Sequence, residues 1–347
     1  MSLFSIQNIA VKGLACAVPQ NIVANKDYPY HNEKENQQFI ATTGIEYRRI
    51  AHSNITAADL CEQAAHQILK DLKWAKEEVN ILIFLSQTPD YKIPCTATIL
   101  QDKLGLPKSC LAFDVNLGCS GYVYGLSIIG SLLHQVKGKA LLLVGDVSSS
   151  CIHPKDKTTA PLFSDAGSAT ALEYKENAPP MFFNLQSDGN GYDAIITKDG
   201  GMRSPISETS FEFDESGSRR PMDMFLDGIK VFNFSRKEVV PNAEKLLTHF
   251  KIQKESIDFF IFHQANLFMN ESIRKKLQLP PEKVPYSLKE FGNTSSASIP
   301  VTMVHALKEK LHQENKQLLL SGFGVGLSWG SAVLNFDNVK VSEMGVV

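Results

Sequence analysis

The sequence predicts a layered α/β fold made of two similar halves, on three observations. Several apolar runs are continuous rather than alternating, which is typical of strands covered on both faces. These runs lie at 79–87, 139–147, 256–264 and 317–324. Segments of helical length, such as 57–72 and 299–313, lie between them, so strands and helices are expected to alternate. The third observation is an internal repeat.

The repeat pairs four segments of the first half with four of the second, in the same order. The pairs are VNILIFLSQ and SIDFFIFHQ, KLGLP and KLQLP, NLGCSGYVYGL and EFGNTSSASIP, and KALLLVGDV and QLLLSGFGV. We therefore predict two α/β halves, 1–173 and 174–347, related by a pseudo-twofold axis. A polar insertion at about 187–222 belongs to neither repeat and is expected to form a loop or cap.

Composition limits the possible partners and the cellular location. The chain has 347 residues, of which 43% are hydrophobic, and a net charge of −2, which gives no general attraction to nucleic acid or anionic lipid. The N-terminus lacks the pattern of a signal peptide, and no run reaches the roughly 18 apolar residues of a membrane span. We expect a cytoplasmic protein that binds neither nucleic acid nor membrane.

Cys119 is the cysteine with a reactive context. The six cysteines are scattered without C-x-x-C pairs, so zinc binding and disulfides are not indicated, and most are expected to be small core residues. Cys119 instead lies between the apolar segment FDVNL and the helix-like GYVYGLSIIGSLL, in a turn framed by Gly118 and Gly121. At a helix N-terminus the peptide dipoles favour thiolate over thiol, so we predict a nucleophile.

His263 and Asn293 complete the predicted site. His263 ends the strand-like run FFIF, and Asn293 lies in the turn GNTSSAS, opposite Cys119 when the repeats are aligned. Strand ends of open α/β sheets commonly form sites, so the three groups are expected to meet near the pseudo-twofold axis. The thiolate can hold an acyl group as a thioester, and both other side chains can donate hydrogen bonds to an oxygen that becomes negative. The glycine-rich LLLSGFGVGLSWGSA offers backbone N–H groups for an oxyanion hole.

The chain resembles β-ketoacyl-acyl-carrier-protein synthase III, a condensing enzyme of the thiolase fold. The resemblance runs over nearly the whole length and includes TGIEYRRI, DVNLGCSGYVYGL, LFSDAGSATAL, FHQANLFMNESIRKKL, FGNTSSASIP and GFGVGLSWGSA. It implies a thiolase-like fold in an α-β-α-β-α arrangement. It also implies a decarboxylating Claisen condensation between an acyl primer and malonyl-acyl-carrier-protein, with thioester substrates and no cofactor or metal.

The resemblance assigns roles to the three polar residues and to the glycine-rich turn. Cys119 would hold the primer, and His263 and Asn293 would bind the malonyl thioester carbonyl. Backbone N–H groups of Cys119 and of the segment Gly324 to Val325 would hold the oxyanion.

Further positions match family residues around the substrate. Phe163 would lie near the thiolate, and the pantetheine arm would be lined by Phe232, Ala265 and Asn266. Ile93 would close the acyl pocket of the partner subunit, which implies a homodimer. An acyl carrier protein would be a partner, docking on Arg274, Lys275 and Lys276.

Several positions depart from the family pattern. The tryptophan and arginine that grip the adenine end of coenzyme A are Gln38 and Thr42 here, so we expect the primer to come from a carrier protein. The other departures are Lys157 for an arginine, Ile229 for an asparagine in the tunnel, Phe268 for a basic residue and Val325 for a glycine. Because Val325 is β-branched, it is poorly suited to positive φ.

Three other functions are weighed against condensation. The chain could transfer an acyl group from Cys119 to a hydroxyl or amine without releasing carbon dioxide. It could also be a non-catalytic partner of the same fold, although that role predicts loss of the nucleophile. A cysteine hydrolase fits less well, because such enzymes use the histidine as a base and lack this duplicated architecture.

Overall fold

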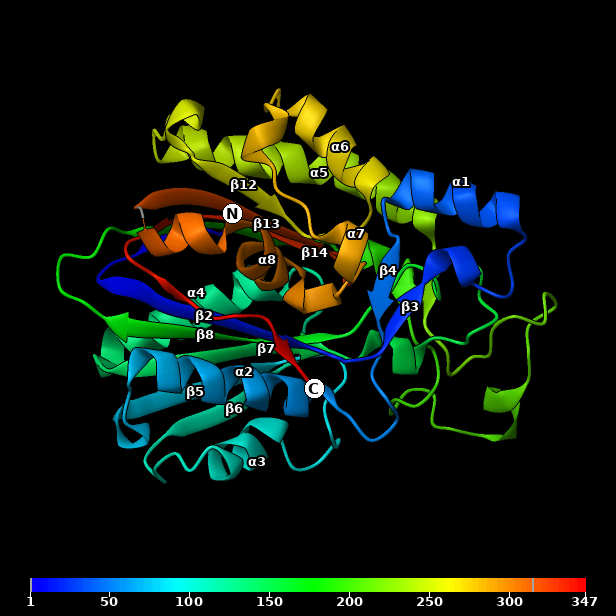
Figure 1. Ribbon diagram of the computed structural model, residues 1–347, viewed down its shortest axis with the longest axis horizontal. Helices are drawn as coiled ribbons and strands as arrows, with labels where there is room; N and C mark the ends of the chain where they lie inside the picture. The colour runs from blue at the N-terminus through cyan, green and yellow to red at the C-terminus, as the bar shows by residue number, and fades with distance from the viewer. Residues whose placement is uncertain (1, 314) are drawn as a thin grey trace.

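A computed structural model describes residues 2–313 and 315–347, and it has two β-sheets stacked between layers of helices (Figure 1). The first sheet has the strand order β15-β2-β8-β7-β5-β6, with β16 also paired to β2. Its strands are β2 (Ile9–Val18), β5 (Val79–Leu85), β6 (Leu111–Val115), β7 (Lys139–Asp146), β8 (Ala166–Tyr174), β15 (Lys340–Val341) and β16 (Gly345–Val346).

The second sheet has the order β1-β9-β14-β13-β12. Its strands are β1 (Ser2–Ile6), β9 (Met181–Ser187), β12 (Phe259–Phe262), β13 (Lys316–Gly324) and β14 (Ser328–Phe336). The β12–β13 pair is parallel, and the β13–β14 and β14–β9 pairs are antiparallel. In the first sheet the counterpart β5–β7 is likewise parallel, and β7–β8 and β8–β2 are antiparallel. The two sheets thus share one topology over four strands.

The halves exchange their end strands. Strand β1 belongs to the first half of the chain but pairs with β9 in the second sheet, whereas β15 and β16 pair with β2 in the first. A cut between residues 173 and 174 therefore describes the sequence repeat better than it describes the packing, and Tyr174 still belongs to β8.

Two helices lie between the sheets, and four others cover the outer faces (Figure 1). The central helices are α4 (Gly121–Val136) and α8 (Ser298–Gln313), and each contacts both sheets. Helices α2 (Ala57–Leu72) and α3 (Thr96–Lys103) cover the outer face of the first sheet, and α5 (Gly228–His249) and α6 (Leu267–Lys276) cover that of the second. This five-layer arrangement confirms the predicted fold class.

Alternating strand residues explain why both sheet faces are covered. In β5, Ile81 and Ile83 pack into the core between the sheets, while Leu82 and Phe84 pack under α2 and α3. Side chains of a strand point alternately to opposite faces, so a continuous apolar run serves two cores at once.

Smaller elements surround one end of the sheets. They are β3 (Ile22–Ala24), α1 (Glu33–Thr43), β4 (Tyr47–Arg49), β10 (Ile195–Ile196), β11 (Phe225–Leu226) and α7 (Leu288–Phe291). The insertion consists mainly of loops and 3-10 turns, and β10 and β11 pair as a short ribbon at its base. Over residues 2–313 and 315–347, no helix has the length and apolar character needed to cross a membrane.

A buried carboxylate joins the two halves. Asp146, at the end of β7, accepts hydrogen bonds from Ser86 Oγ at 3.1 Å and from the Gln87 backbone N–H at 2.7 Å. Its other oxygen accepts from the backbone N–H of Ser296 at 3.2 Å and from Ser296 Oγ at 2.5 Å. Ser296 lies just before α8, so Asp146 connects strand ends of the first sheet to the start of a central helix.

We expect Asp146→Ala to lower the free energy of unfolding by at least about 2 kcal/mol, because several buried donors lose their acceptor together. Urea denaturation followed by circular dichroism measures this change. Asp193→Ala is the control, since Asp193 makes an exposed ion pair with Lys230 and should change stability by less than about 1 kcal/mol. Equal effects of the two substitutions would show that Asp146 does not hold the halves together.

Candidate active site

Cys119 lies in the turn between β6 and α4, two residues before the helix begins. The Gly121 N–H donates to the Gly118 carbonyl at 2.7 Å, which closes the turn. Ser120, the N-cap residue, is tied by its hydroxyl to Ser328 Oγ at 2.7 Å, so the turn is fixed to β14 of the other sheet. Cys119 is 7% exposed and lines a cavity.

The resting thiol is protonated, contrary to the thiolate that the helix N-terminus predicts. Burial, with the nearby negative charge of Asp146, raises the pKa of Cys119 to about 11. Hydrogen bonds from the Val325 backbone N–H, the Ser295 hydroxyl and the Cys119 backbone N–H lower it only in part. Removing a thiolate from water therefore outweighs the helix dipole in this cavity.

His263 follows β12 at the sheet end that faces the cavity. Its backbone N–H donates to the Ser321 carbonyl at 2.8 Å, and its ring meets Phe323 edge-on with centroids 5.5 Å apart. Burial lowers the pKa of His263 to about 3, partly offset by a hydrogen bond to the Ser295 backbone. The imidazole is therefore neutral at physiological pH and can donate one hydrogen bond.

Asn293 is held by the backbone of residues 162–164. Its N–H donates to the Leu162 carbonyl at 3.1 Å, and its carbonyl accepts from the Ser164 N–H at 2.9 Å. The side-chain Oδ1 accepts from the Ser295 N–H at 2.9 Å, while Nδ2 has one long contact, 3.5 Å from the Ala265 carbonyl. This pattern leaves the amide nitrogen as the group available to donate to a ligand in the cavity.

The turn after β13 closes over the sulfur. A Cβ added at Gly324 would lie 2.9 Å from Cys119 Sγ, so only glycine fits at this position. Val325 is not among the residues with positive φ, whereas Gly324 and Gly326 both have positive φ. The concern about a β-branched residue here is therefore removed, because the flanking glycines take the unusual conformations.

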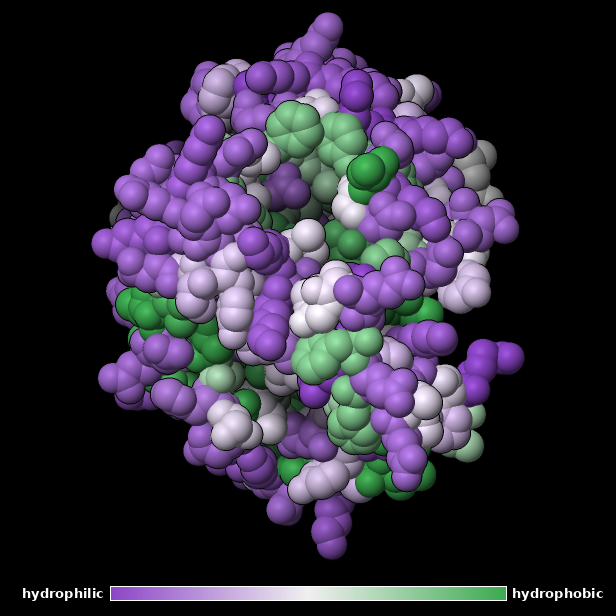
Figure 2. Space-filling model, turned by 90° about the vertical axis from the view of Figure 1, so that its right-hand side faces the viewer, coloured by the Kyte–Doolittle hydropathy of each residue, from purple (hydrophilic) through white to green (hydrophobic). Residues whose placement is uncertain are grey.

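The cavity brings together all three predicted polar groups. Cys119, His263 and Asn293 all line it, although they come from distant segments. Phe163, Ala265, Asn266 and Gly324, also predicted, line it as well. Figure 2 shows the side of the molecule where α1 and β4 lie, with a hollow bordered in part by apolar side chains.

Other predicted residues lie outside the cavity lining. The Phe232 ring stacks on Phe268 with centroids 5.2 Å apart, and the Phe268 and Ile229 side chains are exposed. Lys157 forms an ion pair with Glu35 of α1 at 3.7 Å, so a carboxylate accompanies this cation. Ile93 is 88% exposed and does not reach the cavity of its own chain.

The predicted docking cations are not equivalent. Arg274 donates to both oxygens of Glu271 at 2.8 Å and to the Leu279 carbonyl at 2.6 Å, so it stabilises the end of α6. Lys276 Nζ donates to the Arg236 carbonyl at 2.8 Å, and Lys275 is exposed. Docking of a carrier on Arg274, Lys275 and Lys276 stays a prediction, and Lys275 is the member of the set whose side chain is most available for it because Arg274 is paired with Glu271.

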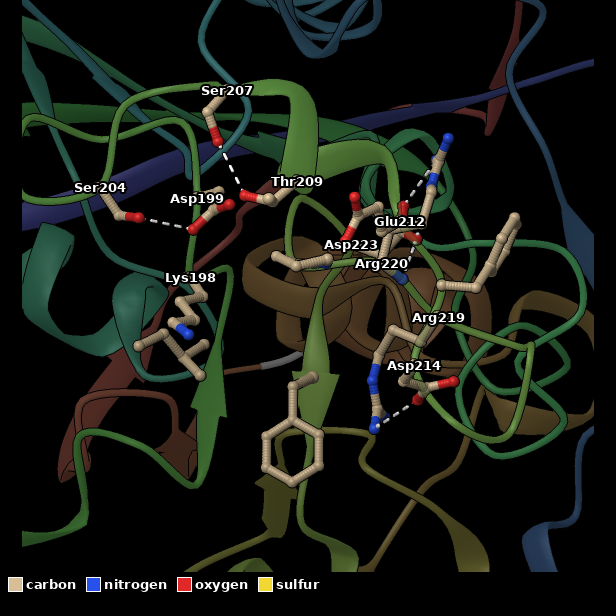
Figure 3. Close-up of a pocket in the computed structure, with 14 residues that line it drawn as sticks. Lys198, Asp199, Ser204, Ser207, Thr209, Glu212, Asp214, Arg219, Arg220 and Asp223 are labelled. Carbon is tan, nitrogen blue, oxygen red and sulfur yellow. Dashed lines mark hydrogen bonds and ion pairs between the residues drawn. The ribbon is translucent and has the colours of Figure 1, made fainter.

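A second, polar depression is lined by residues of the insertion and of the ribbon β10–β11 (Figure 3). Ile195 and Leu226 line the cavity, whereas their neighbours Ile196 and Phe225 line the depression. Arg219 pairs there with Asp214 at 3.5 Å, and Arg220 pairs with Asp223 at 2.8 Å. These arginines are already neutralised, and the depression does not include the thiol.

Sequence reasoning missed several residues that support the site. Ser295 bonds the Cys119 sulfur, Asp146 lies close enough to raise its pKa, and Ser298 bonds His263 Nδ1 at 2.7 Å. Ser295 and Ser298 both belong to the motif GNTSSAS, in which the sequence analysis assigned a role to Asn293 alone. The sequence signal for these supporting residues is the run of hydroxyl side chains just before an apolar helix, because buried hydroxyls need hydrogen-bond partners.

Comparisons with known proteins agree with this geometry. Residues 113–189 match the family model described as 3-oxoacyl-[acyl-carrier-protein (ACP)] synthase III, and residues 247–336 match its C-terminal model. The β-ketoacyl-[acyl-carrier-protein] synthase III of Syntrophomonas wolfei is 33% identical over 331 residues, covering 94% of this chain and 97% of that protein. Synthase III 1 of Halalkalibacterium halodurans is 31% identical over 328 residues, covering 94% and 98%.

A solved structure shows the same architecture. The crystal structure of 3-oxoacyl-(acyl-carrier protein) synthase from Burkholderia xenovorans superimposes with a TM-score of 0.94 and 37% identity, and the match covers 99% of each chain. The thiolase-like fold predicted from the sequence is thus confirmed. The chain belongs to the β-ketoacyl-[acyl-carrier-protein] synthase III family.

Proposed function

We propose that this protein condenses an acyl primer with a malonyl thioester on a carrier protein, with loss of carbon dioxide. The observation that carries the proposal is that one buried cavity holds a thiol, a neutral imidazole and an amide donor together. In the first step, the Cys119 sulfur attacks the primer thioester carbonyl. The bond to the donor's sulfur breaks, the proton lost by Cys119 leaves with the departing thiol, and the backbone N–H groups of Cys119 and Val325 hold the oxyanion.

In the second step, the malonyl thioester carbonyl lies between His263 and Asn293. Its carboxylate departs as carbon dioxide, and the electron pair forms an enolate whose oxygen accepts hydrogen bonds from both side chains. The enolate carbon attacks the acyl carbonyl and expels the Cys119 thiolate. The thiolate then takes a proton from water, because the pKa of the Cys119 thiol lies far above neutrality. No cofactor or metal enters either step.

Transfer of the acyl group to a hydroxyl or amine is the alternative outcome for the same acyl-enzyme. Two donors aimed at a second carbonyl favour condensation, because simple transfer needs no stabilised enolate. Carbon dioxide released from a malonyl carrier in proportion to product distinguishes the reactions. If the protein were non-catalytic, no acyl group would pass from Cys119 to any acceptor.

The proposal includes a homodimer. Strand β6 is an edge of the first sheet within the described chain, and its Leu111 is 46% exposed. An unpaired edge is a template for pairing with another strand. A second copy paired there would cover the edge and bring the exposed Ile93 toward a neighbouring site.

We expect Cys119→Ala to abolish acylation, measured as added intact mass after incubation with thioester substrates. Cys151→Ser is the control and should retain the label. Because the pKa of the Cys119 thiol is about 11, its alkylation rate should still rise about tenfold per pH unit from about pH 8 to about pH 10. A plateau below about pH 8 would instead show that the thiolate is the resting form.

We expect His263→Ala and Asn293→Ala to retain acylation of Cys119 and to lose condensation. Loss of one preorganised oxyanion donor lowers the rate by about 10²–10³. Carbon dioxide release from malonyl-carrier reports the second step, and intact mass reports the first. A variant that fails to acylate but condenses a preformed acyl-enzyme at the wild-type rate would reverse the assigned roles.

We expect the primer to be accepted from a carrier protein in preference to coenzyme A. Gln38 and Thr42 cannot form the paired charge-assisted bonds that arginine makes with phosphate, and Lys157 is paired with Glu35. Loss of one such bond costs roughly 1.5–3 kcal/mol, or about one to two decades of affinity. The measurement compares kcat/KM for Cys119 acylation by one acyl group on each donor.

Lys275→Glu is the matched test of carrier docking. It should raise KM for the carrier-bound primer and leave a short pantetheine thioester unaffected, with a smaller difference at high salt. A clear preference for coenzyme A in the wild-type protein would contradict the donor assignment.

A further inference from the structure

We propose that Ser298 is a positioning residue that holds His263 in the tautomer with its proton on Nε2. The inference deepens the proposed condensation, because it concerns how the imidazole becomes a hydrogen-bond donor to the malonyl thioester. Ser298 is the first residue of α8, so a central helix would set the protonation of a residue in the cavity.

The contact involves one ring nitrogen. His263 Nδ1 lies 2.7 Å from Ser298 Oγ, and both residues are at least 98% buried. The backbone N–H of Gln264 donates to the same hydroxyl oxygen at 3.3 Å. Nδ1 is therefore occupied, and Nε2 is the nitrogen left for a substrate.

Hydrogen-bond accounting sets the direction of the bond. A serine hydroxyl has one proton to donate and two lone pairs, and a neutral imidazole has one N–H and one lone pair. Because the Gln264 N–H donates to Ser298 Oγ, the hydroxyl proton remains to be donated, and among the described residues Nδ1 is the acceptor within reach. With the proton on Nδ1 instead, both the His263 Nδ1–H and the Gln264 N–H would donate to Ser298 Oγ. The Ser298 hydroxyl proton would then have no acceptor among the described residues.

The other contacts of the ring are consistent with this assignment. Phe323 fixes the ring plane from one side, and Asn270 Nδ2 donates to the His263 carbonyl at 3.1 Å. These contacts fix the position of His263, so the Ser298 hydroxyl stays within hydrogen-bond distance of Nδ1.

The tautomer matters because the two forms act oppositely on a carbonyl oxygen. Nε2–H donates to the oxygen and stabilises the enolate, whereas an unprotonated Nε2 would place a lone pair against it. Asn293 is oriented in the same way, since its Oδ1 is taken by the Ser295 N–H and its Nδ2 is left to donate. The turn before α8 would thus orient both donors.

Activity measurements on three variants test the role. We expect Ser298→Ala to acylate Cys119 normally, to keep its KM for malonyl-carrier, and to lose roughly tenfold or more in kcat for condensation, less than the loss of a whole donor. Ser298→Thr, which keeps the hydroxyl, should recover most of the rate. Thr302→Val, which removes a buried hydroxyl one turn further along α8, is the control and should condense normally.

A direct reading of the tautomer separates this inference from the proposed function. In protein labelled with ¹⁵N-histidine, the His263 signals, identified by their loss in His263→Gln, should show a protonated Nε2 and an unprotonated Nδ1. This measurement needs no substrate, so it remains decisive if wild-type protein releases no carbon dioxide. A proton on Nδ1 in the wild type, or an unchanged tautomer and rate in Ser298→Ala, would overturn the inference.

Discussion

Polar groups buried at the junction of the two sheets are the constraint on which this structure depends. Asp146, His263 and Asn293 each lie at the end of an apolar segment, and all three are at least 97% buried. A buried polar group without a partner costs free energy, so the surrounding backbone and hydroxyls must satisfy each of them. The motif GNTSSAS does this for both sides at once: Ser296 bonds the carboxylate of the first half, and Ser298 bonds the imidazole of the second.

The same burial sets the charges in the cavity. The thiol pKa is raised to about 11 and the imidazole pKa is lowered to about 3, so both groups are neutral at rest. An ion pair of thiolate and imidazolium, as in cysteine hydrolases, is therefore disfavoured here. Fixed donors act more strongly in such a dry cavity than in water, because little solvent competes for the developing oxyanion. Burial therefore favours a reaction that neutral hydrogen-bond donors stabilise over one that needs a charged pair.

Local patterns made the fold and the three polar residues predictable, whereas longer-range effects did not appear in the sequence. The continuous run of β5 and the glycines around Cys119 are local signals, and the repeat aligned Cys119 with Asn293. The exchange of β1 between sheets depends on pairing across about 180 residues, for which a five-residue segment carries no signal. The raised pKa of Cys119 depends on desolvation, which is a property of the packed cavity. The pairing of Arg274 with Glu271 was visible in principle, since the residues are three apart on one helix.

The charges and aromatic side chains on the surface around the cavity bear on which molecule donates the acyl group. Lys157 is balanced by Glu35, and the position of a basic residue holds Phe268 stacked on Phe232. Attraction of a nucleotide depends on unpaired cations near its phosphates, and this attraction is strongest at low salt, where it is least screened. Attraction of an apolar protein surface depends on buried area, so the exposed Phe268 ring favours a folded partner over a phosphate-rich one. Under the proposed function, replacing the first kind of attraction by the second would change which molecule delivers the thioester, while the interior donors and the chemistry that they support would stay the same.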